Sequence, residues 1–239
     1  MDFNVITAKK FYPNQVDEQT LLKNKTQTII AKKRLDAINK AINNAKDVII
    51  FDDGLQERNI DYDLKIVCFK KNNWIGNGQL IPSGPLREKV ESLKNYDVVF
   101  LNGKNNSSIN IEEAIFKINP EIRIFNSNYE IKNLNKLDKN SNYLIFSGIG
   151  DPSSFKEILI ENNINVIKEK IFTDHYIYKK EDVKNIIEEA KKVNAKILTT
   201  EKDFVKLSDD VTGEIDYLKI ELKIEEEQKF INFLNDKLN

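Results

Sequence analysis

Residues 47–56, DVIIFDDGLQ, join a short apolar run to two adjacent carboxylates and a glycine. The β-branched and aromatic side chains of 48–51 are typical of a buried strand. Asp52 and Asp53 follow directly, and an unpartnered carboxylate is costly to bury. Because ligands of α/β sheets bind beyond the carboxyl ends of the strands, we predict that this pair holds a metal ion or another ligand. The structural alternative, in which Asp-Gly makes a turn or caps a helix, stays open.

Apolar runs alternate with helical periodicity on both sides of this stretch. In 32–45, Leu35, Ile38, Ala41 and Ile42 recur at helical spacing and predict the buried face of a helix. Strands are expected at 26–31, 47–51, 64–69, 97–102 and 121–126, and further helices near Leu86 and at 111–118.

The second half of the chain continues the alternation. We predict strands at 143–150, 164–172 and 195–200, and helices at 154–163 and 181–193. The tail from Glu221 is expected to be a helix that buries Ile224, Phe230, Ile231, Phe233 and Leu234. The polar segment 133–142 lacks periodicity and marks a boundary near residue 135. The sequence therefore predicts the α/β class, with two α/β domains (1–135 and 136–239) and largely parallel sheets.

The composition excludes several classes of partner. With 37 basic and 38 acidic residues, the chain has no net field that would attract nucleic acid. No apolar stretch approaches the roughly 20 residues that cross a bilayer, so we expect no transmembrane segment. The single cysteine, Cys68, excludes an internal disulfide, and its apolar surroundings predict a buried thiol.

The loop GNGQLIPSGPLRE at 76–88 is a second candidate site. Glycines allow the backbone to approach a ligand closely, and its N–H groups can cradle an anion. Arg87 would then clamp a phosphate, and Glu88 would orient it or share a metal. The alternative is a rigid connection that carries an ordinary surface Arg–Glu pair.

The segment FTDHY at 172–176 contains the only histidine, His175. The neighbouring Asp174 can set the tautomer of the imidazole, which would then carry a proton or donate a hydrogen bond. A surface or packing role is the alternative. SGIGDP at 147–152 and TTEKDFVKL at 199–207 are first interpreted as structural turns, although either can line a ligand cleft.

Taken in order, these stretches resemble the tetraacyldisaccharide 4′-kinase family, the lipid A 4′-kinases of Gram-negative bacteria. The resemblance spans nearly the whole chain. It is carried by VDE at 16–18, Arg34 after a strand, DDGLQ at 52–56, GNGQLIPSGPLRE at 76–88, SGIGDP, TDHY, and TTEKD with VKL.

The resemblance implies a P-loop NTPase-like first domain and a smaller second domain that closes the cleft. It implies transfer of the γ-phosphate of ATP, with Mg²⁺, to the 4′-hydroxyl of a tetraacyldisaccharide 1-phosphate in lipid A biosynthesis. The partner would be this lipid A precursor at the membrane surface. The expected location is cytoplasmic, at the cytoplasmic face of the inner membrane.

The family's site residues are carried over by position. Asp17 is similar to the acid that activates the sugar hydroxyl, and His175 to the histidine that the second domain brings to the nucleotide. Asp52 and Asp53 look like the metal-binding carboxylates, and Asp53 is also expected to be catalytic. The residues expected around the phosphates and the acceptor are Arg34, Gln56, Arg87 and Glu88.

The family's Gly-rich phosphate-binding loop should precede VDE, yet the first glycine is Gly54. We therefore expect the first domain to be incomplete, with Met1 inside it and the Walker A segment absent. The alternative function is a truncated, catalytically incompetent family member or a fragment that needs the missing segment. Glu57 stands where the family commonly has a histidine.

Two other functional classes fit the sequence less well. A metal-dependent phosphatase would use Asp61 and Asp63 as a nucleophile pair, but such a pair should follow a buried strand, and here it precedes 64–69. A non-catalytic interaction domain would have no need of acids, Arg87 and His175 at strand ends and loops.

Overall fold

The computed structural model describes residues 3–57, 59–103, 110–208 and 211–238. Two compact units make up the chain, and both are discontinuous in sequence. The first unit is Met1–Glu57 with Ile131–Lys219, and the second is Arg58–Glu130 with Ile220–Asn239. The division at residue 135 stays a prediction; the chain returns to the first unit close to that position.

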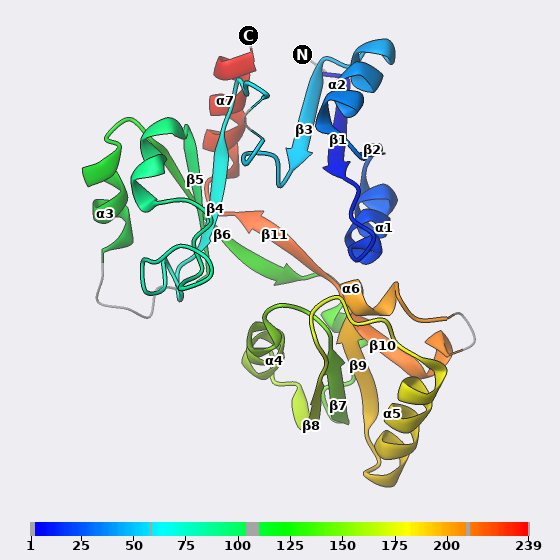
Figure 1. Ribbon diagram of the computed structural model, residues 1–239. Coiled ribbons are helices and arrows are strands. Elements are labelled where there is room, and N and C mark those ends of the chain that lie inside the picture. Colours follow the sequence, from blue (N-terminus) through cyan, green and yellow to red (C-terminus); the bar gives the residue numbers. More distant parts are fainter. Residues whose placement is uncertain (1–2, 58, 104–109, 209–210, 239) are drawn as a thin grey trace. The chain divides into compact units, whose positions relative to one another are not determined.

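The first unit contains two parallel sheets. In one, the strand order is β2-β1-β3, with α1 and α2 following β1 and β2 in the chain (Figure 1). The bounds are β1 (Val5–Lys10), α1 (Val16–Lys25), β2 (Thr28–Ala31), α2 (Arg34–Asn43) and β3 (Val48–Asp52). Lys9 lies opposite Asp52 in the parallel register of β1 and β3. The carboxyl ends of these two strands therefore lie side by side.

Helix α2 buries only part of the face that its apolar spacing predicts. Leu35 and Ile42 are exposed, whereas Arg34, Ala37 and Ala41 are buried. Ala37 packs with alanines of β1 and β2 in a core of small side chains. Ala41 is buried as predicted, and the prediction was wrong for Leu35 and Ile42 because Arg34 is drawn inward by the polar partners described below.

The second sheet of this unit has the order β10-β9-β7-β8. Its strands are β7 (Asn142–Ser147), β8 (Asn165–Ile171), β9 (Lys196–Thr200) and β10 (Ile215–Leu218). The helices are α4 (Pro152–Glu161), α5 (Lys180–Lys192) and α6 (Glu201–Phe204), with 3₁₀ turns η2 (Leu134–Lys136) and η3 (Thr212–Glu214). Val183 and Ile186 of α5 pack on Leu144, Phe146 and Ile197 of the sheet.

The second unit is built on a sheet of order β11-β6-β5-β4. Its elements are β4 (Ile66–Lys70), η1 (Val90–Asn95), β5 (Val98–Asn102), α3 (Ile111–Ile118), β6 (Arg123–Ile131), β11 (Ile220–Ile224) and α7 (Glu227–Leu238). Alternate residues of β5 face opposite sides of the sheet. Val99 packs with Ile115 of α3, and Phe100 packs with Phe230 of α7.

Further predictions differ from the structure, among them the burial of Ile231, which is 40% exposed. The segment after Leu86 forms the 3₁₀ helix η1 instead of an α-helix. Ile224 lies in strand β11 and not in the C-terminal helix, because apolar and charged residues alternate in IELKI as in a strand. Cys68 is exposed, because β4 is an edge strand of its sheet.

Within the described ranges, none of the helices has the length and apolar character needed to span a bilayer.

Candidate active site

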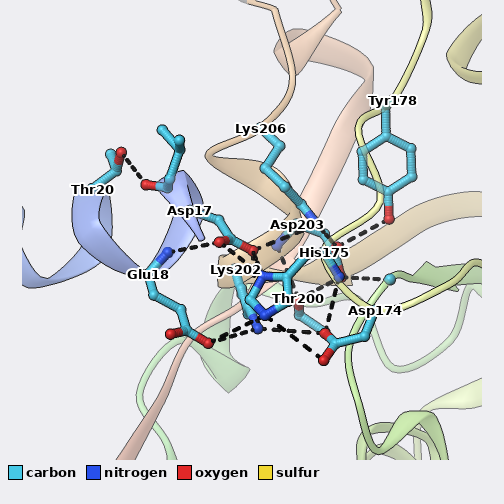
Figure 2. Close-up of polar contacts among 12 residues, drawn as sticks. Asp17, Glu18, Thr20, Asp174, His175, Tyr178, Thr200, Lys202, Asp203 and Lys206 are labelled. Carbon is cyan, nitrogen blue, oxygen red and sulfur yellow. Dashed lines mark hydrogen bonds and ion pairs between the residues drawn. The ribbon is translucent and has the colours of Figure 1, made fainter. Parts of the chain in front are cut away.

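The first turn of α1 places Asp17 against His175 (Figure 2). The Asp17 side chain is only 2% exposed, and its carboxylate oxygens lie 3.1 and 3.2 Å from His175 Nδ1. An ionised carboxylate can only accept, so Nδ1 carries the proton in this contact. The structure thus joins two residues that are 158 positions apart in the sequence.

His175 has a left-handed backbone, with φ of 57°. Its N–H donates to the Gly148 carbonyl over 3.1 Å, which fixes this uncommon conformation. Its Nε2 lies 3.7 Å from Glu18 Oε1 and 3.8 Å from Asp174 Oδ2. The side chain that orients Nδ1 is therefore Asp17, and not the sequence neighbour Asp174 as predicted.

Two ammonium groups from the TTEKD–VKL segment face Asp17. Lys206 Nζ and Lys202 Nζ lie 3.8 and 3.9 Å from Asp17 Oδ2. Lys202 also pairs with Glu18 at 3.0 Å and with Asp174 at 3.5 Å. The buried Asp17 carboxylate therefore has positive charge on several sides.

Glu18 links this cluster to the end of β3. Its Oε2 accepts from Lys9 Nζ at 2.8 Å, and the same Nζ lies 2.5 Å from Asp52 Oδ2. Burial would raise the pKa of Glu18, but hydrogen bonds from Lys9 and Lys202 lower it below the usual value. Burial likewise opposes the charge of Lys9, whose pKa the bonds from Asp52 and Glu18 nevertheless raise.

Asp53 follows β3 with a left-handed φ of 54° and begins the turn at Gly54. The turn interpretation of Asp-Gly is thus confirmed, and a ligand role for the carboxylates is compatible with it. Across the parts of the chain that are described, no three His, Cys, Asp or Glu side chains are grouped to hold a metal. Mg²⁺ in phosphate-transfer sites commonly takes one or two carboxylates with phosphate oxygens and water, so this donor pair fits that ion.

Arg34, the first residue of α2, is 7% exposed and holds the turn after β3. Its Nη2 donates to the Asp53 carbonyl, and its Nη1 lies 3.6 Å from Glu57 Oε2. The carboxylate that replaces the expected histidine at position 57 thus partners a buried guanidinium. Gln56 is exposed in the same turn.

The loop at 76–88 belongs to the second unit. A side chain at Gly84 would meet the Gln79 carbonyl oxygen at 2.4 Å, so the close chain crossing there requires glycine. Arg87 is exposed. Glu88 accepts from Tyr96 OH over 3.1 Å, and burial together with Glu88 raises the pKa of Tyr96 to about 12. The shaped loop is confirmed, whereas a phosphate role for Arg87 and Glu88 stays a prediction.

Five charged residues of this site had no predicted role: Lys9, Glu18, Lys202, Asp203 and Lys206. Two signals were available. Lys9 is a charged residue near the end of an apolar strand, and Lys202 and Lys206 are four positions apart in the segment 199–207. The partners of these residues come from distant segments, so sequence spacing alone could not supply them.

Comparisons with known proteins agree with the resemblance. The model of the tetraacyldisaccharide-1-P 4′-kinase family matches residues 3–239. A tetraacyldisaccharide 4′-kinase of Pelagibacter ubique (strain HTCC1062) is 48% identical over 98% of this chain and 76% of its own length. Proteins of the same name from Rickettsia bellii and Rickettsia akari are 39% and 35% identical. These matches cover 82% and 98% of this chain and 60% and 71% of the two relatives.

A crystal structure of LpxK from Aquifex aeolicus in complex with ATP has a similar fold. The TM-score is 0.69 at 21% identity, covering 100% of this chain and 80% of that one. This likeness and the parallel sheets confirm the predicted α/β class. The chain belongs to the tetraacyldisaccharide-1-P 4′-kinase family.

Proposed function

We propose that this protein transfers the γ-phosphoryl group of ATP to the 4′-hydroxyl of a tetraacyldisaccharide 1-phosphate. Family membership supports the reaction class. The observation that carries the assignment of residues is the buried Asp17 carboxylate against His175 Nδ1. A truncated, incompetent family member is the less favoured alternative, because Asp17 and His175, which the resemblance assigns to the reaction, are in contact.

Phosphoryl transfer requires an acceptor oxygen aligned with the γ-phosphorus and relieved of its proton. In our proposal, Asp17 accepts the proton of the 4′-hydroxyl as that oxygen bonds to phosphorus and ADP leaves. His175 donates its Nδ1 proton as a hydrogen bond to Asp17 and so orients the carboxylate. The lysines around Asp17 compensate charge in a region where water is largely excluded.

Asp52 and Asp53 would hold Mg²⁺, which neutralises charge on the β- and γ-phosphates when bound. Lys9 already compensates Asp52 in the structure. We also propose that the lipid substrate is met at the cytoplasmic face of the inner membrane, which is where a tetraacylated amphiphile would be presented to this enzyme.

The test is incubation of the protein with Mg-ATP and tetraacyldisaccharide 1-phosphate, with phosphorylated lipid and ADP as products. Asp17→Asn should lower kcat by about 10²–10⁴-fold, the usual contribution of a general base. Lys184→Met, an exposed substitution on α5, is the matched control and should retain the activity. Absence of lipid phosphorylation by the unmodified chain, with ATP present in excess, would overturn the proposal.

A further inference from the structure

Asp203, the last residue of TTEKD, is a fully buried carboxylate whose two oxygens contact three hydrogen-bond donors and one ammonium group. Its Oδ2 accepts from Gly148 N at 3.0 Å and from Thr200 Oγ1 at 2.7 Å. Its Oδ1 accepts from Tyr178 OH at 3.0 Å and lies 2.6 Å from Lys206 Nζ. Burial and the Asp203 charge raise the pKa of Tyr178, so its hydroxyl remains a donor. These contacts fix the carboxylate in one orientation.

Asp203 is connected to His175 through one backbone residue. Gly148, whose N–H binds Asp203, accepts from His175 N with its own carbonyl. Tyr178, three positions after His175, is bound to Asp203 by its hydroxyl. The left-handed conformation of His175 is unfavourable for a residue other than glycine and must be held by its surroundings. Both the histidine and the segment after it are thus tied to Asp203.

Asp203 is connected to Asp17 through one side chain. Lys206 Nζ lies between the two carboxylates, 2.6 Å from Asp203 and 3.8 Å from Asp17 Oδ2. The Lys206 side chain is 11% exposed, and its ammonium lies 5.1 Å from the centre of the Tyr178 ring. Its contact with Asp203 is an ion pair whose geometry falls outside that of a regular hydrogen bond. In Figure 2, Lys206, Asp203 and Tyr178 all lie on the same side of Asp17.

We propose that Asp203 is a positioning residue that fixes both members of the Asp17–His175 pair, His175 through Gly148 and Asp17 through Lys206. The inference rests on the proposed function, because it assigns a role in the same site. A buried ion pair contributes little net stability but imposes a defined geometry. In a transfer reaction, misplacement of a catalytic group by about 1 Å can cost about 100-fold in rate. The three motifs SGIGDP, TDHY and TTEKD–VKL each contribute to this arrangement. They supply Gly148, His175, and Asp203 with Lys206, respectively.

Two variants separate positioning from folding. Lys206→Met removes the link to Asp17 and leaves the other three contacts of Asp203. The double variant Asp203→Asn/Lys206→Met removes both charges, so that no uncompensated charge is buried, and Asn keeps an acceptor oxygen. Lys184→Met on α5, whose ion pair with Glu188 is exposed, is the control. Lys206→Arg keeps the charge and should restore the unmodified behaviour.

Two readouts apply to each variant. We expect kcat to fall by about 10- to 100-fold while KM for Mg-ATP and for the lipid changes by no more than about twofold. His175 is the only histidine of the chain, so its imidazole ¹⁵N NMR signals can be identified directly. We expect a single Nδ1-protonated tautomer in the unmodified protein and in Lys184→Met, and averaged or broadened signals in the two Lys206→Met variants.

Folded variants with unmodified kcat and an unchanged imidazole tautomer would overturn the inference. So would a rise in KM for ATP at constant kcat, because that would assign Asp203 to nucleotide binding. If the double variant does not fold by circular dichroism, Tyr178→Phe removes one donor without a change of charge and should perturb the same readouts. If the unmodified chain has no kinase activity, the proposed function is refuted. The positioning role can still be tested, because the imidazole signals do not depend on activity.

Discussion

Glu18 is the residue at which the charges around Asp17 meet those at the end of β3. It accepts from Lys202 at 3.0 Å and from Lys9 at 2.8 Å, and Lys9 continues to Asp52. Positive and negative side chains alternate along this series. Because each charge is compensated by its neighbours, the cost of removing the charges from water stays small. The two candidate acidic sites are therefore parts of one network within the first unit.

This network predicts a pH-dependent stability. The folded pKa of Glu18 lies below 4.5, so Glu18 contributes stability above that pH and loses it as the pH falls through the folded value. The pKa values of Lys9 and Lys202 lie above 10.5, so their contribution is lost only in strong base. Glu18→Gln should lower the free energy of unfolding by about 1–3 kcal/mol at pH 7.

The measurement is urea unfolding of both proteins between pH 7 and pH 3. The difference between them should shrink as the pH falls below 4.5, because the unfolded chain takes up a proton at Glu18 first and the folded protein follows at its lower pKa. A difference that is as large at pH 3 as at pH 7 would contradict the ion-pair account. Glu188→Gln, in an exposed pair on α5, should have little effect at any pH.

The role of a residue could be predicted from sequence only where the residue lies in a distinctive motif. Asp17 and His175 were assigned by resemblance, but nothing in their spacing indicated that they touch. Lys206 and Asp203 were within a segment interpreted as structural, and their importance depends on partners at Gly148 and Asp17. Contacts between distant segments are set by the packing of sheets and helices, which a single sequence does not specify.

At the scale of elements, apolar composition predicted the strands that are buried on both faces, such as β5 and β7. Strand β1 was missed because it ends in two lysines, and β11 because its residues also fit a helical tail. Helix α1 was missed because its sequence has no apolar stripe, and its first turn is anchored by polar contacts of Asp17 and Glu18. The beginning of α1 is therefore set by tertiary polar contacts, which its own sequence does not reveal.

Helix α4 illustrates an element whose beginning the sequence does determine. Asp151 is its N-cap, with Pro152 next and an acceptor oxygen 3.2 Å from Ser154 N. Asp151→Ala should destabilise the protein by about 1 kcal/mol, since it leaves a helix N–H without its cap. Asp151→Ser should recover most of this loss. Thermal unfolding by circular dichroism measures both, and equal midpoints for Ala and Ser would exclude a capping role.

At the scale of the whole molecule, the chain passes between its two compact units more than once. The second unit is completed by the C-terminal residues of β11 and α7, which return after the whole second sheet of the first unit. Local composition carries no information about where the C-terminal segment packs, so the sequence could not assign β11 and α7 to this unit. Each unit nevertheless has its own hydrophobic core.

Because each unit has its own core, we expect a substitution in the core of one unit to destabilise mainly that unit. Phe230 of α7 packs edge-on to Phe100 and Phe125, with ring centres 5.0 and 5.1 Å away. Because Phe230→Ala leaves a cavity between α7 and the sheet, it should destabilise the second unit by about 2–4 kcal/mol. Hydrogen exchange should then show faster exchange in β5, β6 and α7, with β7 and α5 of the first unit unchanged. Val183→Ala on α5 is the reciprocal control and should loosen β7 and α5 instead. Uniform acceleration over both units in either variant would mean that the molecule unfolds as one cooperative body.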